Sequence, residues 1–181
     1  KELNLDYIYQ TIKLFKPDLI FVFGSYIVKE PLLSLLSPGH TINLHLGLSP
    51  YYRGSGTNFW PFVNKELEYV GSTILHLDPG IDTGDIITHV IPKFEIDDNV
   101  HTVGCKVIQS SVDTLIKIIE MVNNKKELQR IKQWSIPNSR YYKNSDFNEE
   151  ILKTYLQNLE KGLVKNYISS SINNLKLVSI D

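Results

Sequence analysis

Two short runs of apolar, β-forming residues lie close together near the start of the sequence, with a short helical segment between them. Leu19–Phe23 is a continuous apolar run that Gly24 ends, which is typical of a strand covered on both faces. Pro31–Leu36 suits a short helix with proline in its first turn, and Thr41–Leu46 is the next strand. A helix that connects two neighbouring strands requires them to run in the same direction. This order therefore predicts parallel pairing and an α/β fold.

The following segments extend this sheet and cover it. Tyr69–Leu77 and Asp85–Ile91 have the composition of strands, and the short, turn-rich loop between them predicts an antiparallel hairpin. The clearest helix is Thr102–Val122, whose apolar residues recur at helical spacing. We therefore expect an open, mainly parallel sheet flanked by helices over residues 1–128. From residue 129 the composition changes, and we expect residues 129–181 to form a small C-terminal appendage.

Charge and composition disfavour several classes of protein. The 181 residues include 19 Lys or Arg and 20 Asp or Glu, so the net charge of −1 gives no electrostatic footprint for nucleic acid or an anionic membrane. The apolar runs are far too short to span a bilayer. Cys105 is the only cysteine, which excludes an internal disulfide and indicates a reducing, cytoplasmic location. One Cys and five scattered His residues give no metal-ligand spacing, so we expect no metal.

A polar pair interrupts the second predicted strand. Asn43 and His45 are two residues apart, so both project from one face of the strand, whereas their apolar neighbours face the other way. An amide and an imidazole at a strand end are costly to bury without a purpose. Asp82, on the Gly-rich loop that follows, would complete a set of amide donor, titratable ring and carboxylate, the parts needed for acyl transfer to an amine. The alternative is that Asn43 and His45 satisfy backbone groups at the strand end.

Two sequence blocks carry a resemblance to a known family. Residues 43–54 read Asn-Leu-His-Leu-Gly-Leu-Ser-Pro-Tyr-Tyr-Arg-Gly and resemble an Asn-x-His then Leu-Pro-x-x-Arg-Gly block, with Ser49 where a leucine is common. Residues 77–85 read Leu-Asp-Pro-Gly-Ile-Asp-Thr-Gly-Asp and resemble a block usually written Gly-Leu-Asp-Thr-Gly. Two ordered blocks at this separation are far more specific than either alone. The chain resembles the folate-dependent formyltransferases, which include glycinamide ribonucleotide, methionyl-tRNA and sugar N-formyltransferases.

The resemblance implies a Rossmann-like catalytic domain that uses 10-formyltetrahydrofolate. It implies that Asn43, His45 and Asp82 are the catalytic trio. Two segments would line the pterin pocket by the same resemblance, and these are Ile27, Val28 and Lys29, together with Asp78, Pro79, Gly80 and Ile81. Members of the family carry an earlier strand–helix–strand portion that helps to bind the acceptor. The resemblance therefore implies a domain that lacks its N-terminal portion and, with it, part of the acceptor site.

The acceptor is inferred from the segment that follows the Asn-x-His pair. Arg53 would bind an acceptor phosphate through its guanidinium, or else hold a loop carbonyl. Asn58, Phe59 and Trp60 would line an acceptor pocket, or else the aromatic residues belong to ordinary core. Residues 51–60 resemble the sugar N-formyltransferases, and the balanced charge disfavours tRNA. We therefore expect a nucleotide-linked amino sugar as the acceptor and no nucleic-acid or membrane partner, and we leave a homodimer open.

Other functions of the same residues stay open. The acceptor would be methionyl-tRNA or glycinamide ribonucleotide in other branches of the family. A hydrolase would use the trio to release formate from formyl-folate with water as the acceptor. A remnant without activity would only bind folate or a partner, although an intact carboxylate and imidazole argue against decay. Formate production without an amine, and folate binding by the chain, discriminate between these functions.

Overall fold

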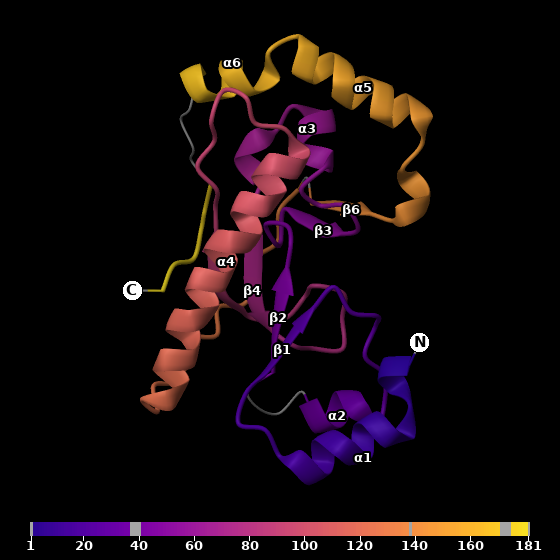
Figure 1. Cartoon of the computed structure of the whole chain (residues 1–181), viewed down its shortest axis with the longest axis vertical. Coiled ribbons are helices and arrows are strands. Elements are labelled where there is room, and N and C mark those ends of the chain that lie inside the picture. Colours follow the sequence, from indigo (N-terminus) through magenta and orange to yellow (C-terminus); the bar gives the residue numbers. More distant parts are fainter. Residues whose placement is uncertain (1, 37–40, 138, 171–174, 181) are drawn as a thin grey trace.

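The centre of the molecule is a four-stranded sheet with the strand order β1-β2-β4-β5 (Figure 1). The computed structural model describes residues 2–36, 41–137, 139–170 and 175–180. The strands of the sheet are β1 (Ile20–Phe23), β2 (Thr41–His45), β4 (Ser72–His76) and β5 (Ile86–Val90). Each strand lies inside the range that the sequence predicts for it.

The pairing of the strands follows from the connections between them. β1 and β2 are parallel, with Phe21 opposite Ile42, and the predicted short helix α2 (Leu32–Leu36) connects them. β2 pairs antiparallel with β4, and β4 pairs antiparallel with β5 as the predicted hairpin, since the loop between them is too short for a crossover. The α/β class and the open sheet flanked by helices are confirmed. The pairing in the described sheet is mixed, parallel on the β1 side and antiparallel on the β5 side.

One face of the sheet is covered by the long helix α4 (Val100–Asn123), as Figure 1 shows. The helix begins slightly earlier than predicted because the Asn99 side chain accepts hydrogen bonds from two backbone N–H groups of the first turn. The core beneath it is a cluster of apolar side chains from three strands and the helix, namely Ile42, Leu44, Ile74, Ile87, Val90 and Ile118. Alternate residues of β2 therefore face away from α4.

A second layer lies against the other face, near β1. Helix α1 (Asp6–Phe15) follows the 3-10 turn η1 (Glu2–Asn4) and packs on α2. The shared core contains Val28, Leu32, Leu33 and Leu36, with Ile8, Ile12, Ile20 and Leu77 packed around it. This packing places the segment after β1 beside the loop that joins β4 to β5.

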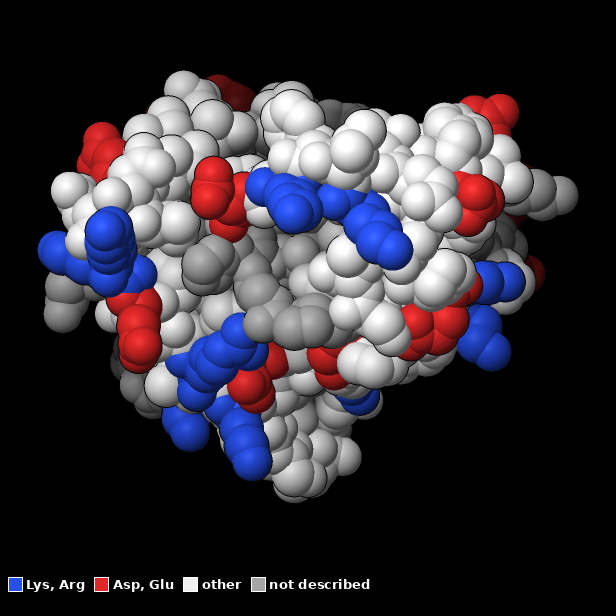
Figure 2. Space-filling view, turned by 90° about the horizontal axis from the view of Figure 1, so that it is seen from below, with Lys and Arg blue, Asp and Glu red and all other residues white. Residues whose placement is uncertain are grey.

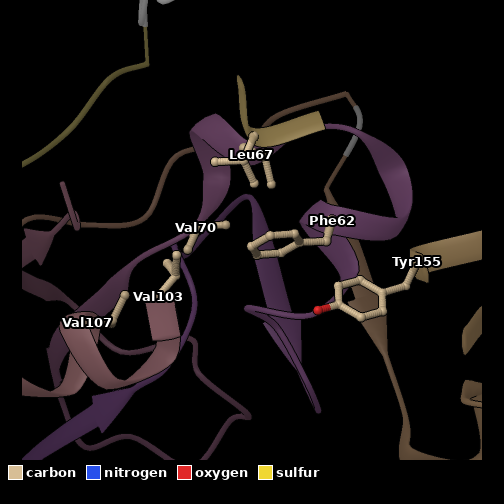
Figure 3. Close-up of a cluster of buried hydrophobic side chains, with 7 residues drawn as sticks. Phe62, Leu67, Val70, Val103, Val107 and Tyr155 are labelled. Carbon is tan, nitrogen blue, oxygen red and sulfur yellow. The ribbon is translucent and has the colours of Figure 1, made fainter. Parts of the chain in front are cut away.

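A separate core lies at the opposite end of the molecule from α1 and α2 (Figure 1). It joins α3 (Trp60–Asn64), the 3-10 turn η2 (Leu67–Tyr69), α5 (Glu149–Glu160) and α6 (Leu163–Ser170) to the first turns of α4. Figure 3 shows Phe62 together with other side chains of this core, which are Leu67, Val70, Val103, Val107 and Tyr155. No helix in the described ranges is long and apolar enough to cross a membrane.

Residues beyond 128 contact the strands at several places, and Val178 is one of them, since its carbonyl oxygen accepts from the backbone N–H of His89 across 2.8 Å. β3 (Tyr52–Gly54) and β6 (Arg140–Tyr142) form a parallel two-stranded sheet, which the sequence did not predict, and the 3-10 turn η3 (Asn144–Asp146) follows. Ile131 forms an antiparallel bridge with Ile86 at the edge of the main sheet. The domain boundary at residue 128 stays a prediction.

Candidate active site

Asn43 and His45 lie at the carboxyl end of β2, on the face of the sheet that α4 leaves open. Their strand neighbours Ile42 and Leu44 belong to the core under α4, so the predicted division of the two faces is confirmed. His45 is buried, with 7% of its surface exposed, and lies opposite Thr73 of β4. The carboxyl ends of strands are where open α/β sheets place their ligands.

Asp82 meets both side chains. Asn43 Nδ2 donates to Asp82 Oδ1 across 3.3 Å, and His45 Nδ1 lies 3.3 Å from the same oxygen. The backbone N–H of Gly54 in β3 donates to the other carboxylate oxygen, Oδ2, also across 3.3 Å. The Asp82 side chain is 14% exposed, so these interactions form largely out of water. The convergence that the sequence predicts for these three residues is confirmed, and their catalytic roles stay a prediction.

The His45 ring is held at both nitrogens. Nε2 lies 3.1 Å from the carbonyl oxygen of Tyr52, and Nδ1 faces Asp82. Burial lowers the pKa of the His45 imidazole below its usual value, and the Asp82 carboxylate opposes this effect. The ring therefore loses its proton readily. When it gains one, each N–H has an oxygen acceptor in place, which suits a group that takes up and returns a proton during a reaction.

The loop that carries Asp82 approaches the sheet closely. Asp82 itself has a φ of 54°, a left-handed conformation that costs a non-glycine residue on the order of 1–3 kcal/mol. A Cβ atom at Gly84 would lie 1.8 Å from the carbonyl oxygen of His76, so only glycine allows the loop to pass β4 here. Asp78 closes the start of the loop, since its side chain accepts hydrogen bonds from the Gly80 N–H and the Thr83 hydroxyl.

The trio lines a cavity of about 720 Å³, a size common among sites for small molecules. Its walls come from the residues after β1, the segment between β3 and α3, and the loop between β4 and β5. The residues predicted from the sequence that line it, besides the trio, are Ile27, Val28, Asn58, Phe59, Asp78, Pro79, Gly80 and Ile81. The cavity therefore has the two walls that the predicted pterin pocket requires.

Three predicted residues lie outside this cavity. Lys29 does not line it, and its backbone N–H donates to an asparagine side chain in η1. Arg53 lines a smaller hollow of about 320 Å³, where its Nη2 donates to Ser139 Oγ across 3.5 Å. Trp60 is 4% exposed and stacks on Tyr142 with ring centres 4.0 Å apart, so it belongs to the core as the alternative interpretation expected.

Sequence reasoning missed three aromatic residues that line the cavity, which are Phe23, Tyr26 and Tyr141. Tyr141 of β6 lines the cavity and is 46% exposed, while its neighbour Tyr142 turns inward onto Trp60. A strand sends adjacent side chains to opposite faces, which explains why the two tyrosines differ. The pair of tyrosines in a polar segment was the available signal, but only the long-range pairing of β6 with β3 brings it to the site.

Asn58 offers the cavity a buried amide. The residue is 9% exposed, and its Oδ1 accepts a hydrogen bond from the Gly71 N–H across 2.9 Å. Its Nδ2 has no hydrogen-bond partner among the described residues. A buried donor in this state favours a ligand oxygen as its partner.

Within the described part of the chain, no group of three or more His, Cys, Asp or Glu residues is placed to hold a metal ion.

Known proteins resemble this chain in both sequence and structure. Residues 1–119 match the family model described as formyl transferase. The methionyl-tRNA formyltransferase of Desulforamulus reducens is 36% identical over 115 residues, which cover 62% of this chain and 35% of that protein. The chain spans about a third to two fifths of the length of the curated relatives it matches.

Two solved structures share the fold. A 4-N formyltransferase from Francisella tularensis is 27% identical with a TM-score of 0.65, and the match covers 85% of this chain and 66% of that one. An N-formyltransferase from Helicobacter canadensis, solved with folinic acid and dTDP-3-aminofucose, is 28% identical with a TM-score of 0.56, covering 68% of this chain and 44% of that one. The family model covers well over half of the sequence and includes Asn43, His45 and Asp82. The chain belongs to the formyl transferase family.

Proposed function

We propose that this chain carries the catalytic site of an enzyme that transfers a formyl group from 10-formyltetrahydrofolate to a primary amine. The observation that carries the proposal is the meeting of Asn43, His45 and Asp82 at one end of a cavity, in a chain of the formyl transferase family. The three side chains supply an N–H donor, a titratable ring and a carboxylate. Transfer of an acyl group between two nitrogens needs these groups.

The first step forms a bond between the amine nitrogen and the formyl carbon. The lone pair of the amine attacks, and the carbonyl π electrons move onto oxygen to give a tetrahedral oxyanion. The Asn43 amide has two N–H bonds, of which one donates to Asp82 and the other is available for this oxygen. One such donor contributes about 2.7–4 kcal/mol to the transition state.

The proton of the attacking amine must then reach the leaving nitrogen. The Asp82 carboxylate accepts this proton, and the adjacent His45 ring shares it because the two groups are 3.3 Å apart. Collapse of the intermediate breaks the bond between the formyl carbon and N10 of the folate, and N10 takes the proton back. The products are a formamide and tetrahydrofolate, and the Asp82–His45 pair returns to its starting state.

The folate would occupy the walls made by the two segments that line the cavity. Ile27 and Val28 offer apolar surface on one side, and residues 78–81 offer backbone groups on the other. Backbone N–H and C=O groups suit a pterin, whose ring edge carries donors and acceptors side by side. The folinic acid in the Helicobacter canadensis enzyme supports a folate in the same family, and this proposal carries it to the present chain.

The acceptor we propose is a nucleotide-linked amino sugar. Figure 2 shows a face on which Lys and Arg side chains are interspersed with Asp and Glu, and the whole chain has a net charge of −1. A tRNA acceptor would favour a continuous basic surface. Asn58 and Tyr141 would contact a sugar or a base, through the buried amide donor and the exposed ring. Methionyl-tRNA remains the second candidate, because the curated relatives are named for it.

The test uses the complete protein and 10-formyltetrahydrofolate with three acceptors in parallel: a panel of nucleotide amino sugars, aminoacylated initiator tRNA and glycinamide ribonucleotide. Turnover of a sugar alone supports the proposal. Turnover of another acceptor alone keeps the chemistry and overturns the choice of substrate. Formate release without any amine would identify a hydrolase. Folate binding with no turnover of any kind would refute catalysis.

A further inference from the structure

A glutamine from beyond the motif blocks holds the backbone of the catalytic aspartate. Gln133 Nε2 donates to the carbonyl oxygen of Asp82 across 2.7 Å and to that of Gly84 across 3.0 Å. One side-chain amide therefore binds the backbone on both sides of Thr83. Gln133 does not line the main cavity, so it has no direct route to a substrate there.

Asp82 needs such support because its backbone conformation is unfavourable in itself. With a φ of 54°, a non-glycine residue keeps this conformation only where surrounding contacts impose it. The other contacts are weaker in geometry, since the Ser49 hydroxyl reaches the Asp82 carbonyl across 3.4 Å and the Gly54 N–H reaches the carboxylate across 3.3 Å. The 2.7 Å bond from Gln133 is the shortest of the three.

Gln133 is itself fixed by its neighbours. Two residues earlier, Ile131 exchanges two backbone hydrogen bonds with Ile86, across 2.8 and 3.0 Å. On the other side, Trp134 packs edge-on against Tyr51, with ring centres 5.9 Å apart. The glutamine therefore projects from a segment held on both sides, and its two hydrogen bonds fix the Asp82 loop to that segment.

We propose that Gln133 is a positioning residue for formyl transfer, which fixes the Asp82 backbone so that the carboxylate meets Asn43 and His45. The inference rests on the proposed function of the site. It assigns a role to a residue that lies outside the span matched by the family model, which ends at residue 119.

The chain provides a matched control four residues earlier. Gln129 also donates from Nε2 to two backbone carbonyls, those of Ile87 across 2.5 Å and Ser179 across 2.8 Å. These carbonyls belong to β5 and the C-terminal segment, and neither is in the trio or its loop. Loss of either glutamine amide removes hydrogen bonds of the same kind, but only one of the two touches the backbone of Asp82.

The experiment compares Gln133→Met, Gln133→Glu and Gln129→Met in the complete protein. Because a shift of about 1 Å in a reacting group costs up to about 100-fold in rate, we expect both Gln133 variants to lower kcat by roughly 10- to 100-fold. KM for the formyl donor should stay within about twofold, since the hydrogen bonds of Gln133 go to Asp82 and Gly84 and not to residues 78–81, which are proposed to hold the folate. Glutamate keeps the size of glutamine but turns a carboxylate toward two carbonyl oxygens, so packing alone will not rescue it. Gln129→Met should keep kcat per folded molecule within about twofold.

A second readout needs no turnover. The ring nitrogens of His45 are followed by NMR against pH, with His45→Gln to assign the signal. Displacement of the Asp82 carboxylate removes the group that raises the His45 pKa, so we expect that pKa to fall in Gln133→Met and to stay unchanged in Gln129→Met. Equal kcat and equal His45 titration in the two methionine variants would overturn the inference. If the wild-type protein transfers no formyl group, the proposed function fails, while the titration still decides whether Gln133 positions Asp82.

Discussion

Replacement of Asn43 by alanine tests the proposed chemistry most directly. The side chain loses two N–H bonds, one to Asp82 across 3.3 Å and one available to the oxyanion. Loss of an oxyanion donor costs about 2.7–4 kcal/mol, and each 1.36 kcal/mol is about tenfold in rate. We therefore expect kcat to fall by roughly 100- to 1,000-fold. The formyl donor should bind almost as tightly, because the donor acts on charge that develops only in the transition state.

The assay is single-turnover formyl transfer at saturating substrates, combined with a direct measurement of folate binding. Asn158→Ala is the matched control, because the buried Asn158 amide likewise donates from Nδ2, to the carbonyls of Phe62 and Val63 across 2.9 and 3.0 Å. It lies in the core between α3 and α5, away from the cavity. Its loss should lower the free energy of unfolding and leave turnover per folded molecule unchanged.

The two variants separate catalysis from folding. An Asn43→Ala protein that keeps turnover within about fivefold of the wild type would refute the oxyanion role, because less than 1 kcal/mol would then remain for it. An equal fall in both variants would attribute the effect to stability. A fall confined to folate binding would instead make Asn43 a residue of the donor pocket.

Three further expectations concern the loop, the core and a partly buried histidine. Gly84→Ala should abolish turnover in a kinetic assay, since its Cβ would lie 1.8 Å from a backbone carbonyl oxygen of β4. Gly104→Ala, in α4 where a Cβ meets open space, should instead raise the free energy of unfolding by about 1 kcal/mol in urea melts. Phe62→Ala should lower that free energy by about 3–5 kcal/mol and Phe15→Ala, 79% exposed, by less than about 0.5 kcal/mol in the same melts. Burial lowers the pKa of His89, so the unfolded chain binds a proton at a higher pH than the folded one does. The free energy of unfolding should therefore fall as the pH drops below about 6.5, by at most about 1.4 kcal/mol per pH unit. Thermal melts of His89→Gln should show a shallower pH dependence than those of the wild type.

The sequence predicts the centre of the fold because that information is local. The strand–helix–strand order predicts the parallel pair, and the two-residue period of Asn43 and His45 places both on one face. The Gly-rich loop supplies a flexible route for Asp82 to reach them. The first two conclusions need only a short window of sequence, whereas the meeting of Asp82 with Asn43 and His45 was predicted from the two motif blocks together; the pairing and the distances confirm all three.

The parts that the sequence did not predict depend on distant pairing. β3 and β6 are short strands almost ninety positions apart, and neither has enough residues to show a period. Their pairing decides that Arg53 lies beside Ser139 rather than in the main cavity, and that Tyr141 reaches the cavity. Trp60 lies in the core because burial of its large ring outweighs any tendency to face a ligand.

β3 contacts β6 along one edge and the side chains of His45 and Asp82 along the other. In a strand, the C=O of one residue and the N–H of the residue two positions later point to the same edge, and the residues between them use the other edge. One edge of β3 pairs with β6, through hydrogen bonds of 2.8 Å at Tyr51 and Ser55. The opposite edge offers the Tyr52 carbonyl to His45 and the Gly54 N–H to Asp82.

The His45 and Asp82 side chains thus occupy the place that a neighbouring strand would take on β3. Both contacts are made by backbone groups, so no side-chain change in β3 removes them directly. They are lost if the strand moves, and β6 is one of the elements that hold it in place. Arg140 of β6 adds a second restraint, because its Nε donates to Glu66 across 2.9 Å and Glu66 also accepts from the Tyr52 hydroxyl. The geometry of His45 and Asp82 therefore depends on residues beyond the motif blocks, through β6 as well as through Gln133.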